Sequence, residues 1–408
     1  MNFSNLRPLP LVAALALASG LAASAHAAPA LRLLAASSQD LVAAELVAPV
    51  AKRQAADALE RAPLAVSWPL DASAALDAQP QAYVAQSREY WVDASASELQ
   101  AGLRLKLSSP GALVRISPHA GKAAVSASDV QLTVDGRRLD NSKSMSAVAD
   151  ADALHAAGMD VPQGSIIMKL DSKAVGDVRL AMPAAQGAHL VHVFEPASAV
   201  ALSLAATRDS IAGGDTIAFR AQLEGATLDR IGGLVSAPDG SSQNVDFVRQ
   251  GDGSYLGQVR PDLAHAGGPG LWEMHAFGVT AGKDAIPRDA KTAFAVSVPV
   301  ARLDGHVSQS ASLTKDGSIA VRIGVQASVA SRYAVSGVLH GTGDDGQLHP
   351  VAMGQSAAWL QPGHGTLELR YDAASLSLHA PWEVRDLRLV NQADFSLQER
   401  RARALYLP

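Results

Sequence analysis

Histidines are the residues of this sequence best suited to acid–base or metal chemistry, and their spacing argues against both. His189 and His192 are three positions apart in a run with strand character. Regular β geometry turns two such side chains to opposite faces, so they cannot hold one metal ion together. We expect one packed imidazole and one at the surface. The other histidines show no H-E-x-x-H spacing of a zinc protease, and the sequence predicts no metal site and no cofactor.

Nucleophiles and carboxylates give no catalytic pattern either. The chain has no cysteine, which excludes a thiolate nucleophile, a disulfide and a Cys-based zinc site. It also has no G-x-S-x-G elbow, although a triad assembled from distant residues stays open, because triads are defined in space. The acidic pairs Asp150/Asp152 and Asp344/Asp345 are expected in solvated loops rather than in general acid–base catalysis. The acidic turns at 251–253 and 341–346 have too few carboxylates for a calcium site of their own, although other loops could complete one. We assign no catalytic, cofactor-binding or metal-ligating residue.

Two pairs of residues are candidates for contact with a ligand or partner. Tyr90 and Trp91 are adjacent on an expected strand, so one of the two rings projects away from the core. That ring either faces a ligand or packs against the helix expected near the N-terminus. Arg401 and Arg403 share one face of the last strand. They are either solvated charges of a sheet surface, partly neutralised by nearby acidic residues, or a surface for an acidic partner.

The segments that carry these residues have the residue pattern of β-strands joined by tight turns. In the stretch 236–260, Asp239-Gly240 and Asp252-Gly253 each precede a short alternating run. Glycine adopts the positive φ angles that tight hairpin turns need. The same pattern recurs through the second half of the chain. We therefore predict a mainly β protein that buries its apolar faces between stacked sheets.

Residues 197–300 have the strand number and spacing of an immunoglobulin-like domain. Its boundary follows Glu195-Pro196, because proline cannot donate to a strand ladder and a new strand rhythm begins there. In the absence of the cysteine pair of antibody domains, Trp272 and Phe277 are the expected core residues. The strand-like runs are Val200–Ala205, Thr216–Gln222, Ile231–Ser236, Gln243–Arg249, Ser254–Arg260, Leu271–Val279 and Lys291–Val298.

Residues 301–408 repeat this organisation, with Asp-Gly turns between further strand-like runs. We predict a second immunoglobulin-like domain in tandem with the first. The two units are similar in length and turn chemistry rather than in residues. The runs are Val307–Leu313, Ser318–Gln326, Tyr333–His340, Ser356–Leu360, Gly365–Tyr371, Trp382–Asn391 and Ser396–Leu405.

Residues 28–196 are predicted to form a β-rich N-terminal domain with helical decoration. The Ala-rich segment Ala36–Glu60 has a loose apolar stripe and is the best helical candidate. Arg61–Gln81 carries several prolines and is expected to be an irregular connector lying over this domain. The strand-like runs are Tyr83–Trp91, Gly102–Leu107, Ala112–Ile116, Val130–Val134, Ser165–Leu170, Val178–Met182 and His189–Phe194.

Two shorter helices are expected inside this first domain. Ser95 and Glu98 have the spacing of a capping box, which predicts a single helical turn before Gly102. Ala147–Ala157 is a further candidate, ended by Gly158. Both would decorate strands rather than form a layer of their own.

The first 27 residues, 1–27, have the order of a secretory signal peptide. Arg7 is the only charge, an apolar run follows, and Ala25-His26-Ala27 fits the small-x-small cleavage rule. The run is shorter than the roughly 20 residues that span a bilayer, and the mature chain is expected to have no transmembrane segment. We expect cleavage near Ala27 and a periplasmic or extracellular location. Loss of Arg7 changes the net charge from -5 to -6, which gives no reason to expect nucleic acid as a partner.

Several motifs together resemble a known family of bacterial exported proteins. They are S-R-E-Y-W at 87–91, P-G-A-L-V-R-I-S-P at 110–118, V-H-V-F-E-P at 191–196, L-W-E-M-H at 271–275 and A-P-W-E-V-R-D-L-R-L at 380–389. The chain is similar to domain-of-unknown-function family 4785. The resemblance implies an N-terminal domain followed by two immunoglobulin-like domains. It implies no activity, and no catalytic residue is carried over.

These observations favour a non-enzymatic binding or adhesion protein of the bacterial envelope or the cell exterior, with an unknown protein or glycan as partner. A secreted hydrolase of peptides or polysaccharides, with the sandwiches as accessory domains, is one alternative. An envelope assembly factor or chaperone is another, and it would require an exposed edge strand or an apolar groove.

Overall fold

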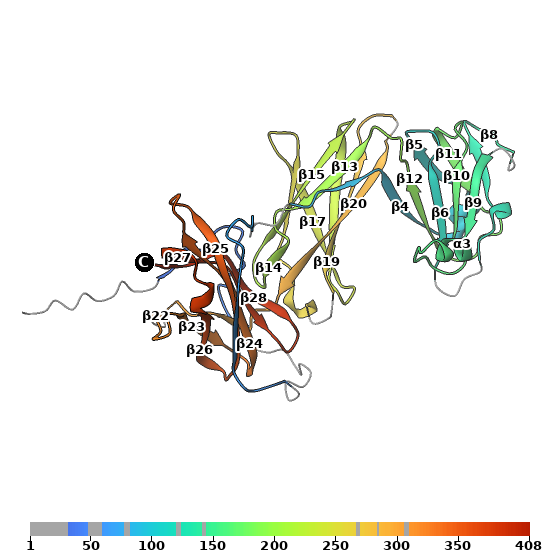
Figure 1. Cartoon of the computed structure of the whole chain (residues 1–408). Helices are drawn as coiled ribbons and strands as arrows, with labels where there is room; N and C mark the ends of the chain where they lie inside the picture. Colours follow the sequence, from blue (N-terminus) through green and yellow to red (C-terminus); the bar gives the residue numbers. More distant parts are fainter. Residues whose placement is uncertain are drawn as a thin grey trace, which may run out of the picture.

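Three β domains follow one another in the computed structural model, which describes residues 32–47, 59–76, 82–119, 124–140, 144–266, 270–283, 285–305 and 310–408. Figure 1 shows them in a row, with the second domain between the other two. Their cores are separate: the buried apolar clusters lie within residues 90–193, 202–294 and 300–407. The prediction of a mainly β fold, with a β-rich N-terminal domain followed by two sandwiches, is confirmed. The predicted signal peptide, 1–27, lies outside the described residues.

The first domain packs two antiparallel sheets face to face. One sheet has the strand order β4-β12-β6-β10-β9 and the other β5-β11-β7-β8. The alternation along each strand sends one set of side chains into the shared core. The strands are β4 (Glu89–Ala94), β5 (Leu103–Leu107), β6 (Leu113–Pro118), β7 (Gln131–Val134), β8 (Arg137–Arg138), β9 (Met145–Asp150), β10 (Ile166–Leu170), β11 (Gly176–Ala181) and β12 (His189–Phe194).

The capping box predicted the helix of this domain correctly. In α1 (Ala96–Ala101), the Ser95 side chain accepts from the backbone of Glu98, and the Glu98 carboxylate accepts from the backbone of Ser95. The second helix, α3 (Ala151–Ala156), is shorter than expected, because the preceding residues belong to β9. A 3-10 turn, η2, covers Ala127–Asp129.

The second domain is a sandwich whose sheets share one strand. The first half of β17 pairs with β16, and its second half pairs with β18 in the opposite sheet. Gly240 and Gly253 have φ angles of 87° and 84°, as the Asp-Gly turns predicted. The elements are β3 (Ala85–Ser87), β13 (Ala201–Ala206), β14 (Ser210–Ala212), β15 (Ile217–Glu224), β16 (Leu228–Ser236), β17 (Ser242–Arg249), β18 (Tyr255–Val259), η3 (Leu263–His265), β19 (Trp272–Thr280) and β20 (Pro287–Ser297).

One expected core residue of this domain lies at the surface instead. Trp272 is buried, but Phe277 is 47% exposed. The two are five positions apart on β19, and an odd separation along a strand puts them on opposite faces. The ring of Phe277 therefore lies outside the core and is accessible to other molecules.

The third domain packs the sheet β1-β28-β27-β24-β25-β2 against a second sheet in which β23 pairs with β21, β22 and β26. Its long strands form the largest of the buried apolar clusters. The elements are β21 (Ala301–Leu303), β22 (Ser310–Leu313), β23 (Ile319–Ala327), β24 (Ser331–Thr342), β25 (Leu348–Leu360), β26 (Gly363–Tyr371), η4 (Ala373–Ser375), β27 (His379–Asn391) and β28 (Ser396–Leu407).

The N-terminal segment corrects the prediction of a helical lead-in to the first domain. Its described residues contain no helix; they add β1 (Arg32–Leu33) to β28 and β2 (Leu64–Pro69) to β25, at the two ends of a third-domain sheet. Figure 1 shows this segment along the third domain. Of the prolines that indicated an irregular connector over the first domain, Pro63 precedes a short edge strand and Pro69 ends it, at positions where a missing N–H is tolerated. The middle of the expected helix, residues 48–58, lies outside the described residues.

The first two domains share one continuous sheet across their junction. Glu89 of β4 pairs with Asp289 of β20, which links the strand order β16-β19-β20 to β4-β12-β6. Just before β4, β3 pairs with β13 of the second domain. The chain therefore crosses this junction as paired strands rather than as a flexible linker.

Candidate binding surface

Tyr90 and Trp91 point to opposite faces of β4, as their adjacency requires. Tyr90 is buried in the first-domain core, where its hydroxyl donates to the carbonyl oxygen of Lys106 at 3.2 Å. Burial raises the pKa of Tyr90, so the phenol stays neutral. Trp91 lies on the outer face of the shared sheet, so of the two predicted residues it is the one available for contact.

Trp91 stands at the centre of a group of rings drawn from two domains. Its indole stacks on the imidazole of His192, with centroids 4.8 Å apart and planes 15° from parallel. Across the junction, the ring of His275 meets it edge-on at 5.6 Å. The ammonium group of Lys291 lies 5.1 Å from the indole centroid, within the range of a cation–π contact.

Two carboxylates hold this group of rings in place. Glu89 Oε2 is 2.7 Å from Nε2 of His192, and Asp289 Oδ2 accepts the backbone N–H of Trp91 at 2.8 Å. Asp289 also lies 3.6 Å from Nε2 of His275, a nitrogen that is buried and makes no hydrogen bond within the described part of the chain. Nε2 of His275 is therefore a buried polar atom that lacks a hydrogen-bond partner among the described residues.

Phe277 completes the surface on the second-domain side. Its ring meets His275 edge-on at 6.0 Å and packs over Gly232, where a Cβ would come within 2.9 Å of Cε2. One side of the ring is therefore against the backbone of β16, while 47% of the residue stays exposed. We refer to the Trp91 surface as the following set: Glu89, Trp91, His192, His275, Phe277, Asp289 and Lys291.

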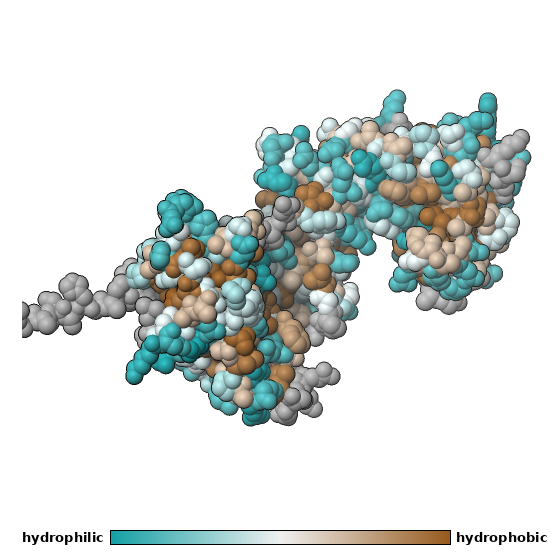
Figure 2. All heavy atoms as spheres, viewed as in Figure 1, coloured by the Kyte–Doolittle hydropathy of each residue, from teal (hydrophilic) through white to brown (hydrophobic). Residues whose placement is uncertain are grey.

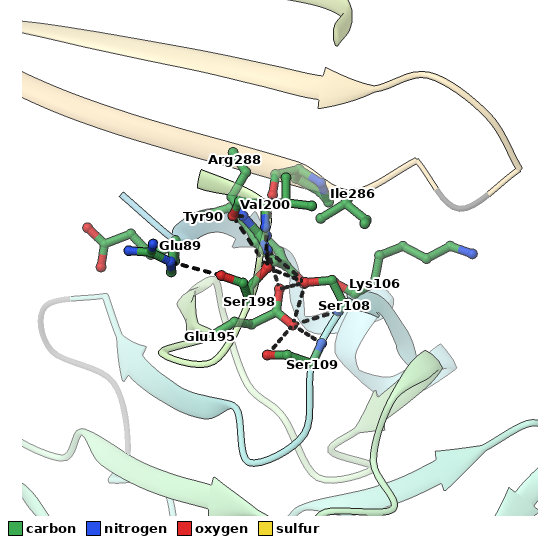
Figure 3. A network of polar contacts seen from close by, with 12 residues as sticks. Glu89, Tyr90, Lys106, Ser108, Ser109, Glu195, Ser198, Val200, Ile286 and Arg288 are labelled. Atoms are coloured by element: carbon green, nitrogen blue, oxygen red, sulfur yellow. Dashed lines mark hydrogen bonds and ion pairs between the residues drawn. The ribbon is translucent and has the colours of Figure 1, made fainter. Parts of the chain in front are cut away.

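A buried ion pair lies on the opposite side of the same strands (Figure 3). Arg288 of β20 donates to Glu195 Oε2 at 2.7 Å, and neither side chain has any solvent exposure. The guanidinium also donates to the carbonyl oxygen of Val200 at 2.9 Å and to the hydroxyl of Ser198 at 2.8 Å. These contacts join β20 of the second domain to the segment that leaves the first, and a further hydrogen bond to the hydroxyl of Ser108, at 2.9 Å, joins it to the first domain itself.

The carboxylate of Glu195 is equally well satisfied. Its Oε1 accepts the backbone N–H groups of Ser108 at 2.6 Å and of Ser109 at 2.8 Å, both from the first domain. Burial of charge is tolerated only with such complete pairing. We call Glu195, Arg288 and their partners the junction network.

Arg401 and Arg403 differ in their surroundings. Arg401 is nearly buried; it donates to Glu399 at 2.7 Å and to the carbonyl oxygen of Leu34 at 2.8 Å, so it belongs to the contact with the N-terminal segment. Burial raises the pKa of Glu399, although Arg401 opposes the effect. Arg403 is 64% exposed and forms a two-point contact with Glu383, at 2.8 and 2.6 Å.

The histidines of β12 separate as predicted. His189 is buried, with Nδ1 at 3.2 Å from the carbonyl oxygen of Gly187, and burial lowers its pKa, while His192 lies on the outer face. Within the described residues no group of three or more His, Asp or Glu side chains is arranged to hold a metal ion. The helices described here are all too short or too polar to cross a membrane.

Sequence reasoning found Trp91 and missed its neighbours from the second domain. The sequence assigns no role to His275, and it predicts Phe277 as a core residue. The available signal was alternation: His275, Phe277 and Lys291 all occupy outward positions of their strands. Their proximity to Trp91 depends on the pairing of β4 with β20, which no local pattern reveals.

Exposed hydrophobic residues are spread over all three domains rather than concentrated. Figure 2 shows them as separate patches between hydrophilic residues on the visible face. Among large exposed side chains, Leu64, Val66 and Trp68 follow one another on β2, at exposures of 56%, 41% and 39%. The Trp91 surface differs from these patches because it combines rings with charged groups from two domains.

Comparisons with known proteins identify a family but no activity. Residues 55–195 match the "Domain of unknown function (DUF4785) N-terminal domain", and residues 301–408 match the DUF4785 C-terminal domain. No curated protein matches the chain. A crystal structure of a DUF4785 family protein from Legionella pneumophila aligns with a TM-score of 0.73 and 18% sequence identity, over 90% of this chain and 99% of that chain. At this identity the likeness demonstrates the fold alone.

Two other solved structures are much less similar. Trypsin-activated alpha-2-macroglobulin from Escherichia coli has a TM-score of 0.21 and 14% identity, over 73% of this chain and 22% of that chain. A tetra-tandem repeat from the extending region of a large adhesion protein has a TM-score of 0.21 and 12% identity, over 78% and 74%. Scores this low carry no argument about fold or function. The two domain matches and the shared architecture agree with each other, and the chain belongs to the DUF4785 family.

Proposed function

We propose that this protein is an exported, non-enzymatic binding protein of the bacterial envelope or cell exterior, and that the Trp91 surface contacts its ligand. The observation that supports this most is the gathering of Trp91, His192, His275 and Phe277 on the open face of a sheet shared by two domains. Tryptophan and other aromatic residues dominate the energetics of recognition surfaces.

The junction network gives this surface the rigidity that binding favours. A surface assembled from two domains loses affinity if the domains must first be ordered against each other. Arg288 and Glu195 fix β20 to the first domain, and the Glu89–Asp289 strand pairing continues the sheet above them. The rings from both domains are thereby held in one arrangement before a ligand arrives.

A differential capture experiment tests the proposal. The mature chain, residues 28–408, is used as bait in envelope extracts beside the double variant Trp91→Ala/Phe277→Ala. A matched control, Trp68→Ala/Phe395→Ala, removes the same two residue types from exposed positions on the third domain. We expect a specific set of molecules that the first variant loses and the control retains, with all three proteins melting at similar temperatures.

The result that contradicts the proposal is equal capture by the wild-type chain and Trp91→Ala/Phe277→Ala. Loss in the Trp68→Ala/Phe395→Ala control alone would instead place binding on the third domain, which carries the exposed apolar edge strand that an assembly factor would require. Fractionation of culture supernatant, periplasm and cytoplasm tests the proposed export. Recovery of full-length chain only from the cytoplasm would reject it.

The hydrolase alternative gains no specific support. His119 and Asp93 approach to 3.0 Å, and His192 and Glu89 to 2.7 Å, which is the reach that acid–base catalysis needs. Both pairs lie on the outer face of the sheet. In the hydrogen bonds of the described chain, neither imidazole contacts a serine or threonine hydroxyl that it could activate.

A further inference from the structure

Two cations flank the rings of the Trp91 surface without a carboxylate partner. Arg115 of β6 lies directly opposite His192 of β12, so their side chains share the outer face. Lys291 lies against the other side of the Trp91 ring. Neither cation forms an ion pair with any residue that the structure describes, whereas Arg288, Arg370, Arg385, Arg401 and Arg403 each do.

The two cations stand three strands apart but not at the same level along the strands. Arg115, His192 and Trp91 lie directly opposite one another on β6, β12 and β4. Asp289 pairs with Glu89 in antiparallel register, so Lys291 of β20 lies about 13 Å along the strand from the position opposite Trp91. With three strand spacings of about 4.8 Å, this offset puts the two backbones roughly 20 Å apart. A ligand that meets both must therefore run diagonally across the strands.

The acidic residues of this surface are turned away from such a ligand or already engaged. Asp289 is only 6% exposed and accepts the N–H of Trp91, and the carboxylate of Glu89 is held by His192. Glu273 is exposed two positions before His275 on β19, so it bounds the surface on that side. Asp93, two positions after Trp91 on the same face of β4, is 70% exposed and held by His119 at 3.0 Å, so it bounds the surface at its other end.

From these observations we infer that the ligand of the Trp91 surface is an extended anionic glycan, an inference that rests on the proposed function. The exposed side of the Phe277 ring is a platform for a sugar ring. Carboxylates of the glycan pair with Arg115 and Lys291.

An acidic peptide fits less well, because this surface is the face of a sheet. Backbone recognition of an extended peptide uses unpaired N–H and C=O groups at a sheet edge. Strands β12 and β4 are both interior to the sheet, with neighbours on each side. The ligand is therefore recognised by side chains alone. Those side chains are aromatic rings together with the cations of Arg115 and Lys291.

The test measures binding of polygalacturonate, an acidic glycan, by calorimetry at low ionic strength, where surface charge is least screened. Neutral dextran and poly-L-glutamate are the comparison probes. We expect saturable binding of polygalacturonate only. The variant Arg115→Gln/Lys291→Gln should weaken it about tenfold, since two charge contacts are lost.

A control variant separates a specific site from net charge. Arg104→Gln/Lys173→Gln removes the same two charges from exposed positions away from the Trp91 surface, one on β5 of the opposite sheet and one in a turn. It should bind polygalacturonate as the wild-type chain does. Equal weakening in both variants, equal binding of poly-L-glutamate, or no binding of polygalacturonate above dextran would each overturn the inference. The last result, together with envelope capture that depends on Trp91 and Phe277, would leave the proposed function standing and reject only the anionic glycan.

Discussion

Replacement of Glu195 by glutamine is the sharpest test of how the first two domains are held together. The amide oxygen of glutamine can still accept the N–H groups of Ser108 and Ser109, so the loop that carries them keeps its contacts. What disappears is the negative charge 2.7 Å from the guanidinium of Arg288, together with the hydrogen bond between them, because the amide NH2 that replaces Oε2 cannot accept. The variant therefore removes the ion pair while it keeps the contacts of the loop.

The expected cost follows from the complete burial of both side chains. Removing one member of a buried ion pair costs about 3–5 kcal/mol, because the remaining charge is left in a medium of low polarity. The uncharged hydrogen bonds of Arg288 to Val200 and Ser198 persist, so we place the effect near the lower limit, at about 3 kcal/mol. For a unit the size of two domains, that lowers the melting temperature by roughly 10 °C.

Scanning calorimetry and a double-mutant cycle measure this effect. Replacing Arg288 by methionine in the Glu195→Gln background removes the unpaired charge, so the double variant should be more stable than Glu195→Gln alone. X-ray scattering of the single variant should also show a wider spread of interdomain angles. A loss below about 1 kcal/mol, the size of an exposed ion pair, would refute the reasoning. So would a double variant that is no more stable than the single one.

Three further substitutions test other parts of the structure. Gly232→Ala pushes the Phe277 ring away from β16, and we expect about fivefold weaker binding in the capture assay at nearly unchanged stability. In Asp316, hydrogen bonding led by the hydroxyl of Thr314 lowers the pKa from 3.8 to about 2. A carboxyl whose pKa is lowered stabilises the fold at pH values above its usual pKa, and this stabilisation is lost as pH falls through about 2. In Asp316→Asn, acid unfolding followed by circular dichroism should therefore depend less on pH between 3.8 and about 2. Leu41→Ala creates a cavity at a site with 1% exposure between the N-terminal segment and the last two domains, and it should cost about 3 kcal/mol in thermal unfolding.

Each of these substitutions has a matched comparison in the chain. Gly251 has no atom within 4 Å of an added Cβ, so Gly251→Ala should leave binding unchanged. Asp372→Asn removes a second carboxylate beside the same arginine, Arg370, and should not alter acid unfolding. Val66→Ala is the comparison for Leu41→Ala, because Val66 is 41% exposed on β2 and its truncation leaves no buried cavity. Equal effects in test and comparison would remove the proposed physical cause.

Local patterns predicted the strands of this protein because strand periodicity is itself local. The run Leu271–Val279 became β19 with a shift of one residue. The capping box of Ser95 and Glu98 predicted where α1 begins. Trp91 was recognised as outward-facing from adjacency alone. In each case a few neighbouring side chains decide the outcome.

The errors arose where pairing between distant segments decides the structure. Leu64–Pro69 forms a strand only because β25, near the other end of the chain, presents an edge for it. Pro63 before the strand and Pro69 at its end pointed to irregular backbone, and no local signal distinguishes an edge strand from a connector. The Trp91 surface escaped prediction for the same reason, since His192 and His275 meet only through the pairing of β4 with β20.

Strand alternation on β20 couples the stability of the junction to the geometry of the Trp91 surface. Arg288 points inward to the junction network, and its neighbour Asp289 points outward to the N–H of Trp91. A displacement of β20 that separates Arg288 from Glu195 must therefore also move Asp289 away from Trp91, because both side chains belong to one strand. Glu195→Gln should then weaken ligand capture, although Glu195 is wholly buried and contacts no ligand. If the junction loosens in scattering while capture stays unchanged, the two faces of β20 are mechanically independent and rigidity does not contribute to binding.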